Sequence, residues 1–253
     1  MSSKVHVDRA DGVVTITFDR PEVKNALDAE SWALLDAALR SVEENDDDRV
    51  LVLTGASGEF TSGADLSGGI KSAPEVVLAK MREIADIIVR LHELPKPTIA
   101  RVDGVAVGVG LSLALGCDLV LASERARFGA VFAKQGLSPD GGLSWLLPRL
   151  IGPARAKELT MLARLVPGPE ALALGLANRI VPVDELDALV AEWAAQLCAF
   201  SPTALRETKQ LIDGTWDASF TDALEREALA QQRSTAARRT ADAPGPARGL
   251  PAP

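Results

Sequence analysis

The stretch from Asp103 to Asp118 holds the residue types and spacing that most directly indicate chemistry. It reads DGVAVGVGLSLALGCD, with Gly104, Gly108 and Gly110 followed by an apolar run. Glycine permits tight turns and a close approach of the backbone to a ligand. The free N–H groups at a helix N-terminus favour negative charge. We therefore predict a buried helix whose N-terminus faces either a phosphate or an oxyanion that forms only during a reaction.

Common phosphate-binding and nucleophile motifs do not fit this stretch. Leu113 occupies the position of the third glycine of a dinucleotide-binding fingerprint, and the chain has no Gly-Lys-Ser/Thr phosphate loop. A nucleophilic serine at Ser112 would need a histidine base, and His6 and His92 are the only histidines, both in unremarkable contexts. We interpret Ser112 as a small helix residue near the pocket.

The composition of the 253 residues excludes several classes of protein. A net charge of −8 and few clustered basic residues argue against nucleic-acid binding. Cys117 and Cys198 lie far apart in apolar contexts, which predicts buried, reduced thiols. Without a Cys/His cluster we expect no metal site. The N-terminus lacks a signal-peptide core and no apolar run is long enough for a membrane span, so we expect a cytoplasmic protein.

Around the glycine-rich stretch, the apolar pattern predicts an α/β fold. We expect a first hairpin turning at Asp11-Gly12, and a helix capped at its N-terminus by Asp28. The predicted strands are 5–7, 13–18, 50–54, 98–102, 119–123 and 126–129. Besides the helix of the glycine-rich stretch, the predicted helices are 29–44, which is the one capped by Asp28, and 75–94, 143–150, 153–163, 169–174, 184–200, 202–212 and 217–237. Strands and helices thus alternate in the first half of the chain, and the last hundred residues are helical. The segment 67–74 is expected to be mobile.

Four segments together resemble the signatures of the crotonase (enoyl-CoA hydratase/isomerase) superfamily. They are FTSGADL at 60–66 and the stretch at 103–118, with DRPEVKNAL at 19–27 and FG at 128–129 in suitable order. The resemblance covers roughly residues 5–235. It implies a crotonase-like spiral of ββα units with a C-terminal helical region, assembled as a homotrimer or hexamer. On that basis we expect a core at 1–200, a helical trimerisation region at 201–240 and a flexible tail at 241–253.

The resemblance also implies the ligand and the donors that bind it. The ligand would be an acyl-CoA thioester, with coenzyme A as part of the substrate and no separate cofactor. By motif position, the backbone amides of Ala64 and Val109 would bind the thioester oxygen as it becomes an enolate. Many relatives carry glycine at the second position. Valine still supplies an N–H group, although its branched side chain narrows the site.

The acid/base residues depart from the hydratase pattern. Hydratases of this superfamily carry two glutamates, at positions that read Ser112 and Phe132 here, and neither residue can move a proton usefully. The segment 137–149, LSPDGGLSWLLPR, instead resembles the loop of enoyl-CoA isomerases, especially the isomerase of ring-epoxidised phenylacetyl-CoA. There the aspartate matching Asp140 faces the acyl chain. The alternative interpretation is that Pro139-Asp140-Gly141 is an ordinary turn.

The remaining candidate residues concern the two ends of the ligand. Lys24 is expected to reach a CoA phosphate, or else to be a solvated surface lysine. Lys209, on a predicted C-terminal helix, is a further candidate to meet CoA, from the same or a neighbouring subunit. Asp65 is expected to order the loop around Ala64. The full CoA-binding set is Val23, Lys24, Ala26, Ser62, Asp65, Leu66 and Gly108. The acyl-pocket set is Ser112, Phe132, Pro139 and Trp145, of which Phe132 and Trp145 could equally be core.

Three functions follow from these residues. The leading hypothesis is an enoyl-CoA isomerase in which Asp140 shuttles a proton while two amides stabilise a thioester enolate. The second is an enoyl-CoA hydratase of fatty-acid or aromatic-acid degradation. The third is an acyl-CoA-binding protein without catalysis.

Overall fold

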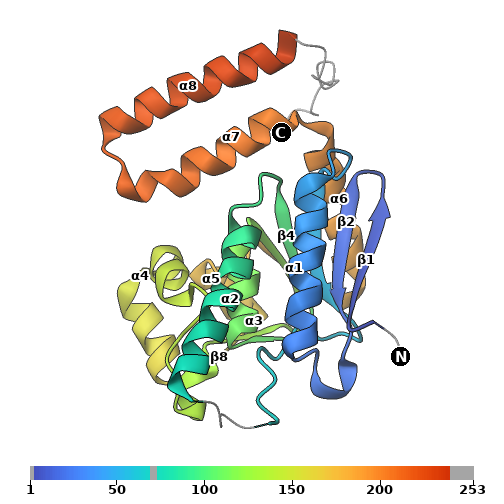
Figure 1. Ribbon diagram of the computed structural model, residues 1–253, viewed down its shortest axis with the longest axis vertical. Coiled ribbons are helices and arrows are strands. Elements are labelled where there is room, and N and C mark those ends of the chain that lie inside the picture. The colour runs from blue at the N-terminus through green and yellow to red at the C-terminus, as the bar shows by residue number, and fades with distance from the viewer. Residues whose placement is uncertain (1–2, 69–72, 240–253) are drawn as a thin grey trace.

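The large sheet of the protein lies between helices on both faces, as the computed structural model of residues 3–68 and 73–239 shows (Figure 1). Its strand order is β1-β2-β3-β4-β6-β9. These strands are β1 (Val5–Ala10), β2 (Val13–Phe18), β3 (Val50–Gly55), β4 (Thr98–Val102), β6 (Leu119–Ser123) and β9 (Arg179–Val181). β1 is antiparallel to β2, and every other pair is parallel. A small second sheet contains β5 (Val105–Val107), β7 (Arg127–Gly129) and β8 (Leu165–Pro167).

The first hairpin and the first helix form where the sequence predicts them. Ala10 pairs with Val13, and Asp11 and Gly12 both have positive φ, as a tight two-residue hairpin turn requires. α1 (Ala29–Glu44) begins after Asp28, whose carboxylate accepts a hydrogen bond from the Ser31 amide at 2.9 Å.

The other helices follow in chain order. They are α2 (Pro74–His92), α3 (Val109–Gly116), α4 (Leu143–Met161), α5 (Gly168–Leu174), α6 (Leu186–Ala199), α7 (Pro202–Asp213) and α8 (Phe220–Arg239). Short 3₁₀ helices occupy Pro21–Val23, Val131–Gln135, Val183–Glu185 and Gly214–Asp217. None of the helices within the described part of the chain has the length and apolar character needed to cross a membrane.

The two faces of the sheet explain the apolar run of β3. Leu51 and Leu53 pack into the core cluster that contains α1, α2 and α3. Val50 and Val52 point to the opposite face, where α6 covers them. Alternate residues of a strand face opposite sides, so a strand buried on both faces reads as a continuous apolar run.

Several boundaries differ from the sequence prediction. β8 and β9 lie in the region expected to be wholly helical, because three-residue strands are too short to show periodicity. The two helices predicted at 143–150 and 153–163 form a single element, α4, which bends at Gly152 (φ 79°, ψ 157°). α8 begins at Phe220 rather than at 217, after a 3₁₀ turn.

The C-terminal helices α7 and α8 form a hairpin that stands at one end of the sheet (Figure 1). Arg233 of α8 joins the hairpin through hydrogen bonds to Glu207 of α7, the shorter at 2.6 Å. The boundary at residue 200 and a function of this region in trimerisation stay predictions. The expected tail at 241–253, and residues 69–72 of the segment expected to be mobile, lie outside the described residues.

Candidate active site

The loop at 60–66 lies against the strand that leads into α3. The Thr61 amide donates to Val105 O at 2.9 Å, and the Val107 amide donates to Thr61 O at 3.2 Å. A Cβ atom on Gly63 would lie 2.7 Å from Val107 O, and one on Gly110 would lie 2.7 Å from Thr61 O. Glycine is therefore required at both positions, because a side chain would push the two segments apart.

This close approach brings the two predicted amide donors together. A Cβ atom on Gly63 would lie 3.4 Å from the nitrogen of Val109, and Ala64 follows directly. Within residues 3–68 and 73–239, neither the Ala64 amide nor the Val109 amide donates to a protein acceptor. Gly108, between β5 and α3, has open space where a side chain would be. Two unpaired N–H groups at the start of a helix are suited to binding a negatively charged oxygen.

Asp140 lies in the loop before α4 and is fixed to α3. The Ser112 hydroxyl donates to the main-chain oxygen of Asp140 at 3.0 Å. Gly141 has a φ of +60°, and a Cβ atom there would lie 2.8 Å from the Ser112 Cβ and 2.9 Å from the Ile88 Cδ1. The loop therefore packs directly on α2 and α3, where it contacts Ser112, which lies about one helical turn along α3 from Val109.

The carboxyl group of Asp140 has the surroundings of an acid/base group. Its Oδ1 atom is buried without a hydrogen-bond partner in the described structure. Burial without a compensating donor disfavours the charged form and raises the pKa of Asp140 to about 6. A carboxyl group whose pKa lies near neutrality can both accept and return a proton.

Ser112 and Phe132 are both buried and neither supplies a proton-transfer group. The Ser112 hydroxyl is used in the contact to Asp140, while Phe132 is part of the core cluster. Pro139 is half-buried beside Asp140. Of the three predicted acid/base positions, Asp140 is the one that carries a carboxyl group, and its loop is bound to α3 through Ser112.

The predicted CoA-binding residues 23–26 and 62 also meet. Ser62 binds this loop twice, through its amide to Lys24 O and through its hydroxyl to Val23 O, both at 2.9 Å. The Lys24 ammonium group is exposed and lies 3.0 Å from a carboxylate oxygen of Glu59. Ala26 is buried, and Leu66 is exposed at the end of the adjoining loop. An exposed cation on this loop is available to a ligand that carries phosphates.

Asp65 supports the loop rather than facing open solvent. Its carboxylate pairs with Arg20 at 2.9 Å and accepts a hydrogen bond from the Ser67 amide at 3.0 Å. These contacts hold the pKa of Asp65 below its ordinary value. Arg20 also donates to Ala26 O at 2.6 Å, so one guanidinium group joins the loop at 20–26 to the loop at 60–66.

Sequence reasoning missed two residues that shape these loops, Arg20 and Asn25. Asn25 is buried with a positive φ, and its side-chain amide donates to Ala56 O at 3.0 Å and to Glu59 O at 2.7 Å. Both residues lie within the DRPEVKNAL segment. A buried polar side chain inside a loop motif was the available signal, because such a group must find hydrogen-bond partners.

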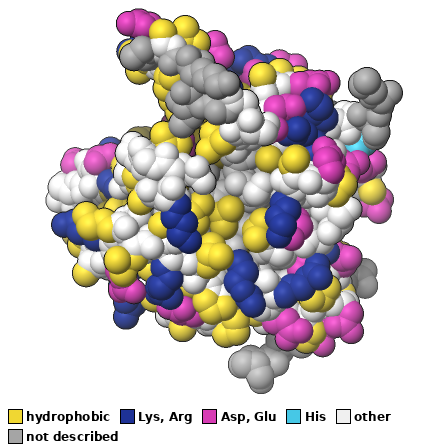
Figure 2. All heavy atoms as spheres, turned by 90° about the horizontal axis from the view of Figure 1, so that it is seen from below, with side chains coloured by type: hydrophobic (Ala, Val, Ile, Leu, Met, Phe, Trp, Pro, Cys, Tyr) yellow, Lys and Arg dark blue, Asp and Glu magenta, His cyan; other side chains and the backbone are white. Residues whose placement is uncertain are grey.

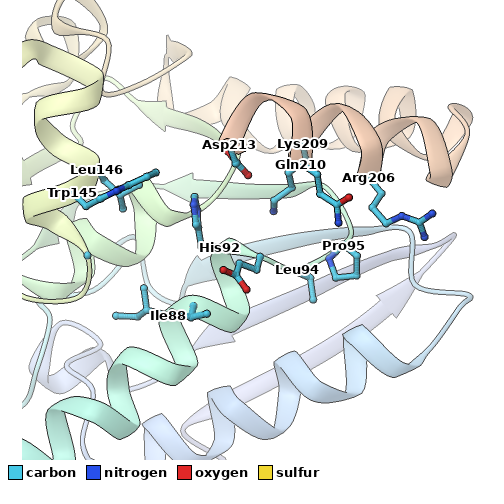
Figure 3. Close-up of a pocket in the computed structure, with 13 residues that line it drawn as sticks. Ile88, His92, Leu94, Pro95, Trp145, Leu146, Arg206, Lys209, Gln210 and Asp213 are labelled. Atoms are coloured by element: carbon cyan, nitrogen blue, oxygen red, sulfur yellow. The ribbon is translucent and has the colours of Figure 1, made fainter. Parts of the chain in front are cut away.

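Two other predicted residues lie away from the amide site. Lys209 of α7 pairs with Asp118 at 3.0 Å, and Asp118 also accepts from Thr98 at the start of β4. That end of the sheet is opposite to the end at which the Lys24 loop lies (Figure 1). Trp145 is partly exposed and lines a cavity of about 580 Å³ between α2, α4 and α7 (Figure 3). Within one chain, Lys209 is thus not placed to meet a ligand held by Lys24.

Neither cysteine has the surroundings of a reactive thiol. Cys117 is buried and Cys198 is half-buried, both as free thiols. Burial raises the pKa of both thiols, to about 12 for Cys117. In the part of the chain that the structure describes, no three His, Cys, Asp or Glu side chains gather as a metal site would require.

Fold and site together define an α/β protein with a ββα spiral, two backbone amides that are unpaired in the described structure and of which one begins a helix, and a half-buried carboxyl group on a loop bound to that helix. The sequence profile described as Enoyl-CoA hydratase/isomerase matches residues 8–243. The chain belongs to this family, the crotonase family.

The names of similar proteins include both an isomerase and a hydratase. The 1,2-epoxyphenylacetyl-CoA isomerase of Escherichia coli K12 is 40% identical over 213 residues, which are 82% of this chain and 80% of that protein. The short-chain-enoyl-CoA hydratase of Clostridium acetobutylicum is 32% identical over 237 residues, 92% of this chain and 90% of the relative. A crystal structure of an enoyl-CoA hydratase/isomerase from Cupriavidus metallidurans CH34 has a TM-score of 0.89 at 33% identity, covering 99% of this chain and 98% of that one.

Proposed function

We propose that the protein is an enoyl-CoA isomerase that moves a double bond, or rearranges a ring epoxide, in the acyl group of a CoA thioester. The observation that carries this proposal is the half-buried Asp140 carboxyl group, whose Oδ1 atom is buried without a hydrogen-bond partner in the described structure and whose pKa is raised to about 6. Isomerisation requires one group that lifts a proton from one carbon and returns it to another. A second acid/base residue is not needed.

In the proposed reaction, the Asp140 carboxylate removes a proton from C2 of a 3-enoyl-CoA. The electron pair moves toward the thioester carbonyl, and the resulting dienolate oxygen accepts hydrogen bonds from the amides of Ala64 and Val109. Protonated Asp140 then returns the proton to C4, so that the double bond lies between C2 and C3. Preorganised donors of this type contribute about 10²–10³ each in rate, because the charge develops only in the transition state.

The surroundings of Ser112 favour isomerisation over hydration. Water addition across a double bond is served by one group that activates water and another that handles the α-proton. Ser112 is fully buried and its hydroxyl is bound to Asp140 O. The protein thus offers one carboxyl group where a hydratase of the expected pattern would offer two.

The CoA moiety is proposed to lie along the loops at 20–26 and 60–66. Lys24 is the candidate for a phosphate, since its ammonium group is exposed and is held by an ion pair to the half-buried Glu59. The corresponding face carries several Lys and Arg side chains around hydrophobic ones (Figure 2). Such a mixture suits a ligand with a charged nucleotide end and a thin apolar arm.

We further propose that the chain forms a homo-oligomer through α7 and α8. Trp216 and Phe220, at the turn of this hairpin, are 58% and 80% exposed. Large apolar side chains gathered on an exposed element are typical of protein–protein contact surfaces.

The reaction is tested by incubating the purified protein with 3-enoyl-CoA and with 2-enoyl-CoA, following double-bond position and water uptake. We expect isomerisation that falls at least 10²-fold in Asp140→Asn. The matched control is Asp187→Asn, which changes an exposed carboxylate on α6 and should leave the rate unchanged.

Two results would overturn the assignment in different directions. Efficient hydration that survives Asp140→Asn would identify a hydratase that does not depend on this residue. Tight thioester binding with neither turnover nor exchange of the α-proton into D₂O would identify a binding protein.

A further inference from the structure

Ile88 of α2 packs against the Asp140 loop and also lines a cavity that the proposed reaction does not use, which Gly142 at the end of that loop lines as well. The Ile88 side chain is 5% exposed. On one side, its Cδ1 atom lies 2.9 Å from the position that a Gly141 Cβ would occupy. On the other side, Ile88 lines the cavity of about 580 Å³ between α2, α4 and α7 (Figure 3). A single side chain therefore contacts both the catalytic loop and the cavity wall.

The cavity is suited to an apolar group at the end nearer Ile88. Trp145 and Leu146 of α4 line it on the side of Ile88, whereas Leu94 lies toward Pro95 and Arg206 (Figure 3). Polar side chains of α7, including Lys209 and Asp213, form the opposite wall (Figure 3). A second cavity of about 480 Å³ adjoins it, since Trp145, Leu146 and Lys209 line both.

We propose that Ile88 closes the far end of the acyl-binding site and thereby restricts the protein to short or compact acyl groups. The inference rests on the proposed function, because it takes Asp140 to face the reacting acyl carbons. We take the acyl atoms beyond those carbons to extend toward the Gly141–Ile88 contact, because Gly141 follows Asp140 and packs against both Ser112 and Ile88. Shortening the Ile88 side chain would join the acyl site to the apolar end of the cavity.

The consequence is a change in how affinity depends on acyl length. In an apolar pocket each added methylene group that is buried strengthens binding about fourfold. With Ile88 in place, this gain stops once the acyl chain reaches the side chain. With a smaller residue, the gain continues as further methylene groups enter the cavity.

The test measures dissociation constants of saturated acyl-CoA thioesters of increasing length, together with kcat/KM for 3-enoyl-CoA of the same lengths. The variants are Ile88→Val, which removes the Cδ1 atom at the Gly141 contact, and Ile88→Ala. Val89→Ala is the matched control, because Val89 lines the same cavity on the same helix. We expect wild-type affinity to level off after a few carbons. For the two Ile88 variants, affinity for the longer acyl chains should rise at least tenfold relative to affinity for the shortest chain. The length profile of the control variant should follow that of wild type.

The inference is overturned if wild-type affinity already rises with every added methylene group, or if folded Ile88→Val and Ile88→Ala keep the wild-type length profile. Binding and turnover separate this inference from the proposed reaction. Altered length dependence of binding without isomerisation in any variant would remove the isomerase assignment and leave the position of Ile88 supported.

Discussion

The hydroxyl group of Ser112 donates a hydrogen bond to the main-chain oxygen of Asp140 over 3.0 Å. This bond joins the helix that begins with the Val109 amide to the loop that carries the carboxyl group. The proposed oxyanion donor and the proposed base are therefore held by one helix, α3. A catalytic group positioned by a rigid element is held more accurately than one on a free loop.

Replacing Ser112 with alanine is expected to loosen the Asp140 loop without unfolding the protein. The Asp140 oxygen keeps its hydrogen bond from the Leu143 amide at 3.1 Å, so the loss of stability should be about 1 kcal/mol. We expect kcat to fall about three- to tenfold with little change in KM, because the hydroxyl positions the base rather than binding CoA. Steady-state kinetics and urea unfolding measure the two effects. An unchanged kcat would show that the hydrogen bond does not position Asp140.

The activity should depend on pH through Asp140. Its pKa is raised to about 6 by burial, and the carboxylate is the form that accepts the α-proton. We expect kcat/KM to rise tenfold per pH unit below about pH 6 and to become constant above it. The profile is measured with 3-enoyl-CoA between pH 4.5 and 8.5. A profile that is flat through pH 6 would contradict ionisation of Asp140 as the controlling step.

The same pKa predicts that Asp140→Asn stabilises the folded protein at neutral pH. Because the folded-state pKa lies above the ordinary value of 3.8, the folded chain holds this proton more tightly than the unfolded chain. Ionisation of Asp140 therefore destabilises the folded protein. This effect is absent below about pH 4 and complete above about pH 6. We expect the variant to gain about 1–3 kcal/mol in the free energy of unfolding at pH 8 and nothing near pH 4. Equal stability of both proteins at pH 8 would contradict the buried environment of this carboxyl group.

The sequence predicts the parts of this site that depend on backbone chemistry. The helix after Gly108 and the small-residue loop around Ala64 could be predicted, because glycine spacing reports where two backbones approach closely. The identity of Asp140 as a candidate came from the resemblance, since a Pro-Asp-Gly triplet alone also predicts a turn. Its raised pKa could not be predicted, because burial of a single carboxyl group depends on packing between distant elements.

Contacts made by side chains across loops were the least predictable part. The position of Ile88 between Gly141 and the cavity depends on how α2 lies against α3 and α4, and the apolar pattern of α2 gives only its buried face. Lys209 illustrates the same limit. Its charge suggested a phosphate partner, whereas the fold pairs it with Asp118 at the opposite end of the sheet.

Replacing Gly63 with alanine should disrupt the amide site. A Cβ atom there would lie 2.7 Å from Val107 O, and the φ of +90° is unfavourable for any other residue. We expect a loss of about 1–3 kcal/mol in stability and at least a 10²-fold loss of kcat, because the Ala64 amide would move away from Val109. Gly68→Ala is the control, since Gly68 has open space around it and no positive φ. Wild-type kinetics for Gly63→Ala would contradict the proposed pairing of the two amides.

Assembly through the C-terminal hairpin is testable at the turn between α7 and α8. Trp216 and Phe220 are exposed there by 58% and 80%, and burying such side chains stabilises association by about 1.5–3 kcal/mol each. The double change Trp216→Glu with Phe220→Glu should therefore convert an oligomer into monomers, measured by sedimentation velocity. Gln232→Glu, at an exposed polar position of α8, adds the same kind of charge to the hairpin and should leave the oligomer intact. A wild-type protein that sediments as a monomer at micromolar concentration, or a double variant that remains oligomeric, would show that this hairpin does not hold the subunits together.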